Sequence, residues 1–194
     1  MRIGITGGIG SGKSEVTKYL RSLGEYVICA DEVSRQIVMP GKEGADALRR
    51  EFGAGIFLAD GTLNRKKLAD EVFSDEKKLM VLNNILHPLI LKRIEELAKQ
   101  REGRVFIDAA LLIQTGMHKT VDMIWLVVAG LNTRISRVVK RDGLSAAEVE
   151  RRIKSQISDE EMAAFADEII RNDGSLSALK AHVDGLLKQL EIVR

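Results

Sequence analysis

Flexible glycines, one lysine and one hydroxyl group come together near the amino terminus, in a spacing that could do chemistry. The segment reads Gly7-Gly8-Ile9-Gly10-Ser11-Gly12-Lys13-Ser14 and fits the pattern G-x-x-x-x-G-K-[ST]. Glycines let the backbone turn tightly and point N–H groups inward, where a side chain would block an approaching polyphosphate. Lys13 would then reach the terminal phosphates, and Ser14 would offer an oxygen to Mg²⁺.

The sequence on either side decides between this interpretation and a glycine-rich turn that ends in Lys-Ser by coincidence. Residues 2–6 read as a short strand, and residues 14–23 carry apolar side chains at helical spacing. Strand, loop and helix therefore occur in the order that a phosphate-binding loop needs. We expect this loop to bind a nucleoside triphosphate.

Short apolar runs alternate with helical patterns and predict an α/β fold. Continuous apolar runs, unlike alternating ones, are typical of strands that are buried on both faces. We expect a five-stranded parallel sheet with helices on both faces, and ligands beyond the carboxyl ends of its strands. The predicted strands are residues 3–6, 26–29, 105–107, 123–129 and 169–170.

Two carboxylates stand where such strands end. Asp31 follows the second run, so it is expected in the crevice beside the loop, as the base for an acceptor hydroxyl. Its alternative role is the N-cap of a helix that begins around Glu32. Asp108 ends the third run, where it would either hold Mg²⁺ through water or cap the next helix.

The remaining patterns predict two helical insertions in one compact unit of residues 1–194. The core would comprise about 1–39, 104–130 and 161–194, with a helical acceptor-binding excursion at about 40–103 and a lid at about 131–160. Pro88 fits the first turn of a helix inside the excursion. The lid segment is rich in basic residues and is divided by the turn at Asp142-Gly143. Either it is a solvated face, or it closes over phosphates.

Composition narrows the class of protein. The net charge of +2 and the aromatic content of 4% give no support to nucleic acid as a partner. The single cysteine excludes an intramolecular disulfide, and the longest apolar run is too short to cross a membrane. We expect a cytoplasmic protein with no membrane partner, as a monomer or small homo-oligomer.

Several further motifs resemble those of one known protein family. Residues 4–14 resemble the family's opening Gly-Leu-Thr-Gly-Gly-Ile-Gly-Ser-Gly-Lys-Ser, and Ala30-Asp31 resembles its Asp-Ala-Asp. Residues 60–65 are similar to its Asp-Gly-x-Leu-x-Arg. Leu86-His87-Pro88 resembles its Leu-His-Pro, and residues 108–112 resemble its Asp-Val-Pro-Leu-Leu. Nearly from end to end, the chain is therefore similar to the dephospho-CoA kinase family of P-loop kinases.

The resemblance implies phosphorylation of the ribose 3′-hydroxyl of dephospho-CoA by ATP with Mg²⁺, the last step of coenzyme A biosynthesis. Asp31, Lys13 and Arg141 would be catalytic, and Ser14 would bind the metal, with Asp108 through water. Asn172 would lie near the adenine. The acceptor side would be lined by Asp31, Arg65, His87 and Asp108. ATP would be bound by Gly8, Ile9, Gly10, Ser11, Gly12, Lys13, Ser14, Glu15, Arg141 and Asn172.

Alternatives remain at this point. His87 could shape a helix entry, and Arg65 could pair with a surface acid. The chain departs from the family pattern at the acceptor side, where Cys29, Ala109, Ala110 and Gln114 replace the usual residues. Another P-loop small-molecule kinase, with a nucleoside monophosphate or a metabolite alcohol as acceptor, is the second hypothesis. A non-catalytic nucleotide-binding module that grips nucleic acid is the third.

Overall fold

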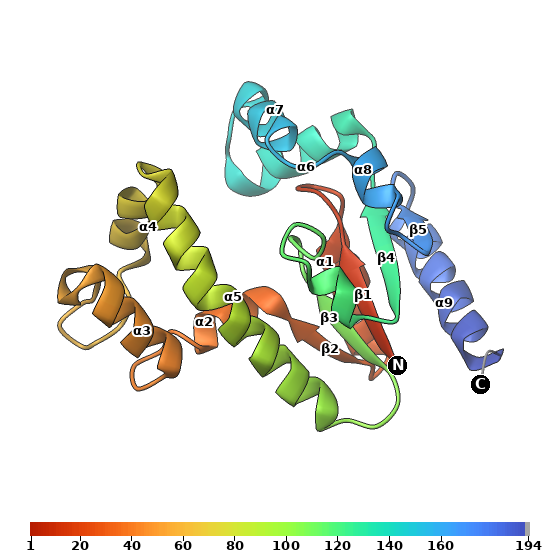
Figure 1. Cartoon of the computed structure of the whole chain (residues 1–194). Helices are drawn as coiled ribbons and strands as arrows, with labels where there is room; N and C mark the ends of the chain where they lie inside the picture. The colour runs from red at the N-terminus through yellow and green to blue at the C-terminus, as the bar shows by residue number, and fades with distance from the viewer. Residues whose placement is uncertain (193–194) are drawn as a thin grey trace. The chain divides into compact units, whose positions relative to one another are not determined.

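The computed structural model describes residues 1–192, which form two compact units. Unit 1 combines residues 1–27 with the chain from residue 103 onward, and unit 2 is the continuous segment Ile28–Glu102 between them (Figure 1). Residues 28–39, which the sequence analysis assigned to the core, therefore group with the helical segment. The expected lid lies within unit 1.

A five-stranded sheet, in the order β2-β3-β1-β4-β5, is formed within the described residues. β1 pairs in parallel with β3 and β4, and β4 pairs in parallel with β5. The predicted α/β fold with a parallel sheet is confirmed, as are the positions of all five predicted strands. The strands are β1 (Arg2–Thr6), β2 (Tyr26–Cys29), β3 (Val105–Asp108), β4 (Met123–Val128) and β5 (Glu168–Arg171).

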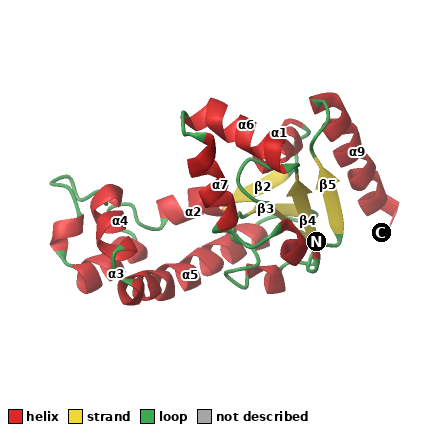
Figure 2. Cartoon of the chain, turned by 90° about the horizontal axis from the view of Figure 1, so that it is seen from above, coloured by secondary structure: helices red, strands yellow, loops and turns green. Residues whose placement is uncertain are grey.

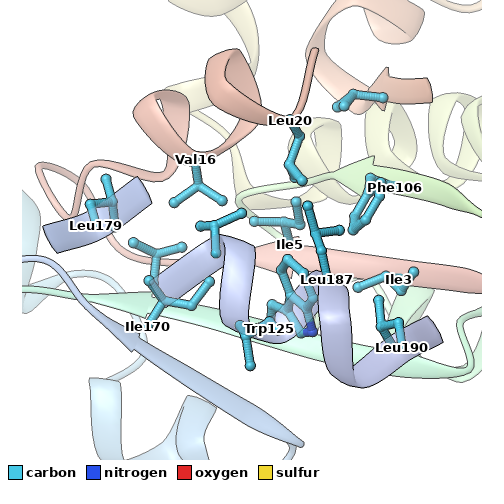
Figure 3. Packing of buried hydrophobic residues seen from close by; sticks show 14 residues of the cluster. Ile3, Ile5, Val16, Leu20, Phe106, Trp125, Ile170, Leu179, Leu187 and Leu190 are labelled. Carbon is cyan, nitrogen blue, oxygen red and sulfur yellow. The ribbon is translucent and has the colours of Figure 1, made fainter. Parts of the chain in front are cut away.

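One face of the sheet in unit 1 is covered by its first and last helices, α1 and α9. Figure 3 shows Val16 and Leu20 of α1, with Leu187 of α9, packed over Ile5 and Trp125 of the sheet. Burial of these aliphatic side chains removes apolar surface from water and so holds helices and strands together. The helices of this unit are α1 (Lys13–Ser22), α6 (Leu131–Asp142), α7 (Ala146–Lys154), α8 (Asp159–Ala163) and α9 (Leu176–Ile192).

The other face carries a smaller apolar cluster. Leu126 and Val128 of β4 pack with Ile113 and with Met162 of α8. Between β3 and β4 the chain runs through turns and the 3-10 helix η2 (Met117–Thr120). Both faces of β4 are thus buried, which explains why its apolar run is continuous. Figure 2 shows the strands of this unit with α9 lying along β5.

Unit 2 is helical and has its own apolar cluster, which includes Val38, Leu48, Ile56 and Leu68. Phe57 and Leu63 form an antiparallel bridge around the turn predicted at residues 59–62. The elements of this unit are α2 (Ala30–Gln36), α3 (Glu43–Phe52), the 3-10 helix η1 (Ala54–Ile56), α4 (Arg65–Phe73) and α5 (Glu76–Lys99).

The prediction that Pro88 lies in the first turn of a helix is wrong. α5 begins at Glu76 behind the N-cap Asp75, whose side chain accepts hydrogen bonds from two backbone N–H groups, and Pro88 stands inside the helix. Proline interrupts the hydrogen-bond ladder at one residue only. Packing of α5 against α2, α3 and α4 holds the helix together across that gap.

No helix among residues 1–192 is both long and apolar enough to cross a membrane.

Candidate active site

The glycine-rich loop joins β1 to α1 and adopts a conformation that needs glycine. Gly10 and Gly12 have φ angles of 77° and 90°, in the left-handed region that side chains disfavour. The loop is closed by hydrogen bonds from Ser11 N to Gly8 O, at 3.1 Å, and from Glu15 N to Gly12 O, at 2.9 Å. The predicted order of strand, loop and helix is confirmed.

Glycine is also needed because α6 lies directly against the loop. A β-carbon built on Gly10 would stand 2.7 Å from the backbone oxygen of Arg134. At Gly8 the same atom would meet the guanidinium of Arg134 and the amide oxygen of Gln156. The glycines of the motif thus serve a second purpose beside their freedom to turn, which is to admit a neighbouring helix.

Lys13, the first residue of α1, forms an ion pair with Asp108, the last residue of β3. The Lys13 Nζ donates to Asp108 Oδ1, and the two side chains are 18% and 10% exposed. β3 is the direct neighbour of β1 in the sheet, so its terminal carboxylate stands beside the loop. The alternative of Asp108 as a helix cap is wrong, because turns follow β3 within the described chain as far as η2.

Arg134, counted in the sequence only as one of several basic lid residues, is largely buried against the loop. Its Nε donates to Ile9 O at 2.8 Å, and its Nη1 lies 3.2 Å from both carboxylate oxygens of Asp159. Gln156 reaches the same loop residue, since its Oε1 accepts from Ile9 N at 2.8 Å. Burial raises the pKa of Asp159, while the charge of Arg134 works in the opposite direction.

Arg137 and Asn172 hold the next part of the loop. Asn172 Nδ2 donates to Ser11 O at 2.9 Å, and Arg137 Nη1 lies 3.3 Å from the same oxygen. Arg137 Nη2 also donates to Asn172 O at 2.8 Å. Asn172 is 5% exposed, so its side chain contacts the loop instead of solvent. Its predicted place near the adenine stays a prediction.

Arg141 lies at the end of α6, with 62% of its side chain exposed. Its guanidinium forms two hydrogen bonds with the neighbouring Asp142, at 2.7 and 2.8 Å. This contact holds the pKa of Asp142 below its usual value of 3.8. The turn predicted at Asp142-Gly143 is confirmed, since Gly143 ends the helix with a φ angle of 69°.

The predicted acceptor residues Asp31, Arg65 and His87 belong to unit 2. Asp31 is exposed in the first turn of α2, whose N-cap is Cys29, so the capping alternative for Asp31 is wrong. Arg65 is the exposed first residue of α4, behind the N-cap Asn64. His87 is half-buried inside α5 and does not shape a helix entry, because α5 begins at Glu76.

A cavity of about 530 Å³ opens elsewhere in unit 2, between α2, α3 and α5. The three predicted acceptor residues do not line it. It is lined by Gln36, Ile37, Met39, Lys42, Glu43, Gly44, Leu89, Lys92, Arg93 and Glu96.

A glycine-rich loop between a parallel strand and a helix, with its lysine beside a strand-end carboxylate, defines a P-loop nucleotide-binding protein. The family model described as dephospho-CoA kinase matches residues 1–178. The dephospho-CoA kinase of Pseudoalteromonas translucida is 41% identical over 96% of this chain and 89% of its own length. That of Geobacter sulfurreducens is 40% identical over 94% of each chain. The chain therefore belongs to the dephospho-CoA kinase family and is a kinase.

Solved structures agree with this fold. A crystal structure of a protein from Thermus thermophilus, 34% identical, covers 98% of this chain and 97% of its own, with a TM-score of 0.85. The dephospho-CoA kinase from Campylobacter jejuni covers 97% of this chain and 96% of its own, at 24% identity and a TM-score of 0.72. A shikimate kinase from Acinetobacter baumannii, at 15% identity and a TM-score of 0.57, shares the fold alone.

Proposed function

We propose that this chain transfers the terminal phosphoryl group of ATP to the ribose 3′-hydroxyl of dephospho-CoA, which yields coenzyme A and ADP. The kinase family supports the reaction class and its acceptor. The structural observation that supports this proposal most is the ion pair between Asp108 and Lys13, the lysine of the loop motif. When ATP binds, a phosphate group can replace the Asp108 carboxylate as the partner of the lysine ammonium.

On the donor side, the loop offers backbone N–H groups and Lys13 to the phosphates. Ser11 Oγ is buried and has no hydrogen-bond partner within the described chain, so it too is free to contact a ligand. Phosphoryl transfer needs mainly positioning and neutralisation of charge, which these groups provide. We place the phosphates of ATP between the loop and Arg141, whose exposed position at the end of α6 leaves it able to exchange Asp142 for a phosphate.

The metal would be Mg²⁺, held by Ser14 and, through water, by Asp108. Among the described residues no group of three or more His, Cys, Asp or Glu side chains could hold a metal. This donor set fits Mg²⁺, which usually keeps several waters and uses one or two protein ligands together with substrate phosphates. When bound, Mg²⁺ would neutralise charge on the transferred phosphoryl group.

On the acceptor side, Asp31 would orient the 3′-hydroxyl and accept its proton, and Arg65 and His87 would bind the rest of the acceptor. Asp31 is exposed and has a carboxylate that reaches solvent, as a base for an incoming hydroxyl requires. Cys29, two residues earlier, carries no carboxylate, so we assign the base role to Asp31 alone.

The test is an assay of ADP release with dephospho-CoA and with a panel of nucleoside monophosphates and metabolite alcohols. We expect kcat/KM with dephospho-CoA to exceed that with each other acceptor by at least about a hundredfold, because an acceptor without the matching hydrogen-bonding groups leaves polar groups of the site unpaired. Faster turnover of another acceptor in the panel would show that the assigned substrate is wrong.

Asp31→Asn tests the base. We expect it to lower kcat by about a hundredfold or more and to leave the Kd for ATP unchanged. Asp46→Asn is the matched control, because Asp46 is likewise exposed in the first turn of a helix of unit 2. If Asp31→Asn and Asp46→Asn turn over at the same rate, Asp31 is not the base.

A further inference from the structure

The side chains that contact the phosphate loop from outside have a common pattern. They bind backbone carbonyl and amide groups of Ile9 and Ser11. We call Arg134, Gln156, Arg137 and Asn172 the loop brace. They come from α6, from the segment after α7 and from the end of β5.

The brace controls the direction of N–H groups that it does not itself touch. A trans peptide unit is planar, so the carbonyl of one residue and the N–H of the next point in opposite directions. Arg134 bonds the Ile9 carbonyl at 2.8 Å and therefore turns the Gly10 N–H away from α6. Asn172 bonds the Ser11 carbonyl at 2.9 Å and turns the Gly12 N–H in the same way.

Gln156 acts on the preceding peptide unit. Its Oε1 accepts from Ile9 N at 2.8 Å, so the Gly8 carbonyl points to the opposite side. There it accepts the hydrogen bond from Ser11 N that closes the loop. Ile9 is thus held from both sides, with its N–H on Gln156 and its carbonyl on Arg134. Because the Ile9 N–H already donates to Gln156, it is not available to a phosphate group.

We propose that Arg134 and Gln156 are positioning residues for ATP, which fix the loop in its phosphate-binding shape before the nucleotide arrives. The inference rests on the proposed function, since it assumes that the loop binds ATP. A loop that is already ordered loses less freedom on binding, so the nucleotide binds more tightly. Arg134 is itself held by Asp159, which keeps the charge of the buried guanidinium balanced.

Gln156→Leu is the sharpest test, because it keeps the size of the side chain and removes the acceptor for Ile9 N. We expect the Kd for Mg-ATP, measured by calorimetry without acceptor, to rise about tenfold, the order expected for one partly buried hydrogen bond. The KM for dephospho-CoA should stay within twofold of its original value. Gln189→Leu is the control, because Gln189 is exposed on α9.

Arg134→Lys provides a second, independent variant in which the charge stays. One ammonium group cannot bond Ile9 O and Asp159 as the guanidinium does, so we expect a similar rise in Kd. Because both residues act on Ile9, the fold rise in the Kd for Mg-ATP of the double variant should be smaller than the product of the rises in the two single variants. Unfolding followed by the fluorescence of Trp125 identifies the temperature range in which each variant is folded.

The results test separately whether Arg134 and Gln156 are positioning residues and whether the proposed function is right. If Gln156→Leu and Arg134→Lys lower only the unfolding temperature and keep the Kd for Mg-ATP within twofold of the original protein, the brace is merely structural and the inference is overturned. If the original protein binds Mg-ATP but does not phosphorylate dephospho-CoA, the proposed function is wrong. The Kd comparison stands in that case, since it needs no acceptor.

Discussion

Removal of the Lys13 ammonium should destabilise the protein as well as inactivate it. In Lys13→Met, Asp108 keeps its charge but loses its partner, at a position where only 10% of its side chain is exposed. Loss of one partner from a fully buried ion pair costs about 3–5 kcal/mol. Since both side chains here retain some exposure, we expect a cost near the lower limit, about 3 kcal/mol. For a chain of this size, that corresponds to a fall in Tm of roughly 6–12 °C.

The assay is thermal and urea unfolding followed by tryptophan fluorescence. Trp125 is the single tryptophan of the sequence and is fully buried in β4, in the same unit as the pair, so its signal reports on the unit that is perturbed. The control is Lys13→Met combined with Asp108→Asn, which removes the unpaired charge and should recover more than half of the lost stability.

Two results would refute the reasoning. Lys13→Met with the Tm of the original protein would mean that the buried carboxylate needs no partner. A double variant that is no more stable than Lys13→Met would mean that the loss comes from packing of the lysine stem and not from the charge of Asp108.

Three further predictions concern other parts of the chain. Pro88→Ala should raise the stability of α5 by about 1 kcal/mol, which is part of what a proline inside a helix costs. The measurement is hydrogen exchange of the amides in unit 2, and faster exchange in the variant would contradict this prediction. Arg141→Met should raise the pKa of Asp142 toward 3.8, measured by carboxyl NMR. Because the folded pKa is lowered, the stabilisation from this pair is present above 3.8 and lost as the pH falls toward the folded pKa; an unchanged titration would contradict the cause assigned. Removal of Mg²⁺ with a chelator should abolish turnover and leave the circular dichroism unchanged, and full activity in the chelator would exclude the metal.

Much of the fold could be predicted from the sequence because the strands of a covered parallel sheet are apolar throughout. The run at residues 123–129, for example, corresponds to β4, which is buried along most of its length. The loop was equally predictable, since the left-handed φ angles of Gly10 and Gly12 are a local requirement for glycine. Pro88 was misplaced because a local rule for helix starts does not include the packing that holds α5 together.

The contact of Arg134 with the loop was harder to predict. Arg134 has the same side chain as the exposed arginines near it, and burial against Ile9 depends on where α6 packs. One signal was present in the sequence. Arg134 lies four residues before the apolar Val138, so the two side chains share one face of α6, and that face is the buried one. The roles of Asp31, Arg65 and His87 stay predictions.

The position of β1 in the sheet has a consequence for the newly made chain. β1 is translated before the other strands of the sheet, yet its two neighbours begin at Val105 and Met123. At usual rates of synthesis, roughly 6 to 24 s pass between the addition of Thr6 and the addition of Val128, so β1 cannot be flanked on both sides any sooner. The intervening segment Ile28–Glu102 is continuous and is complete before either neighbour. During synthesis β1 therefore lacks both neighbouring strands until the part of unit 1 that follows residue 102 has been translated.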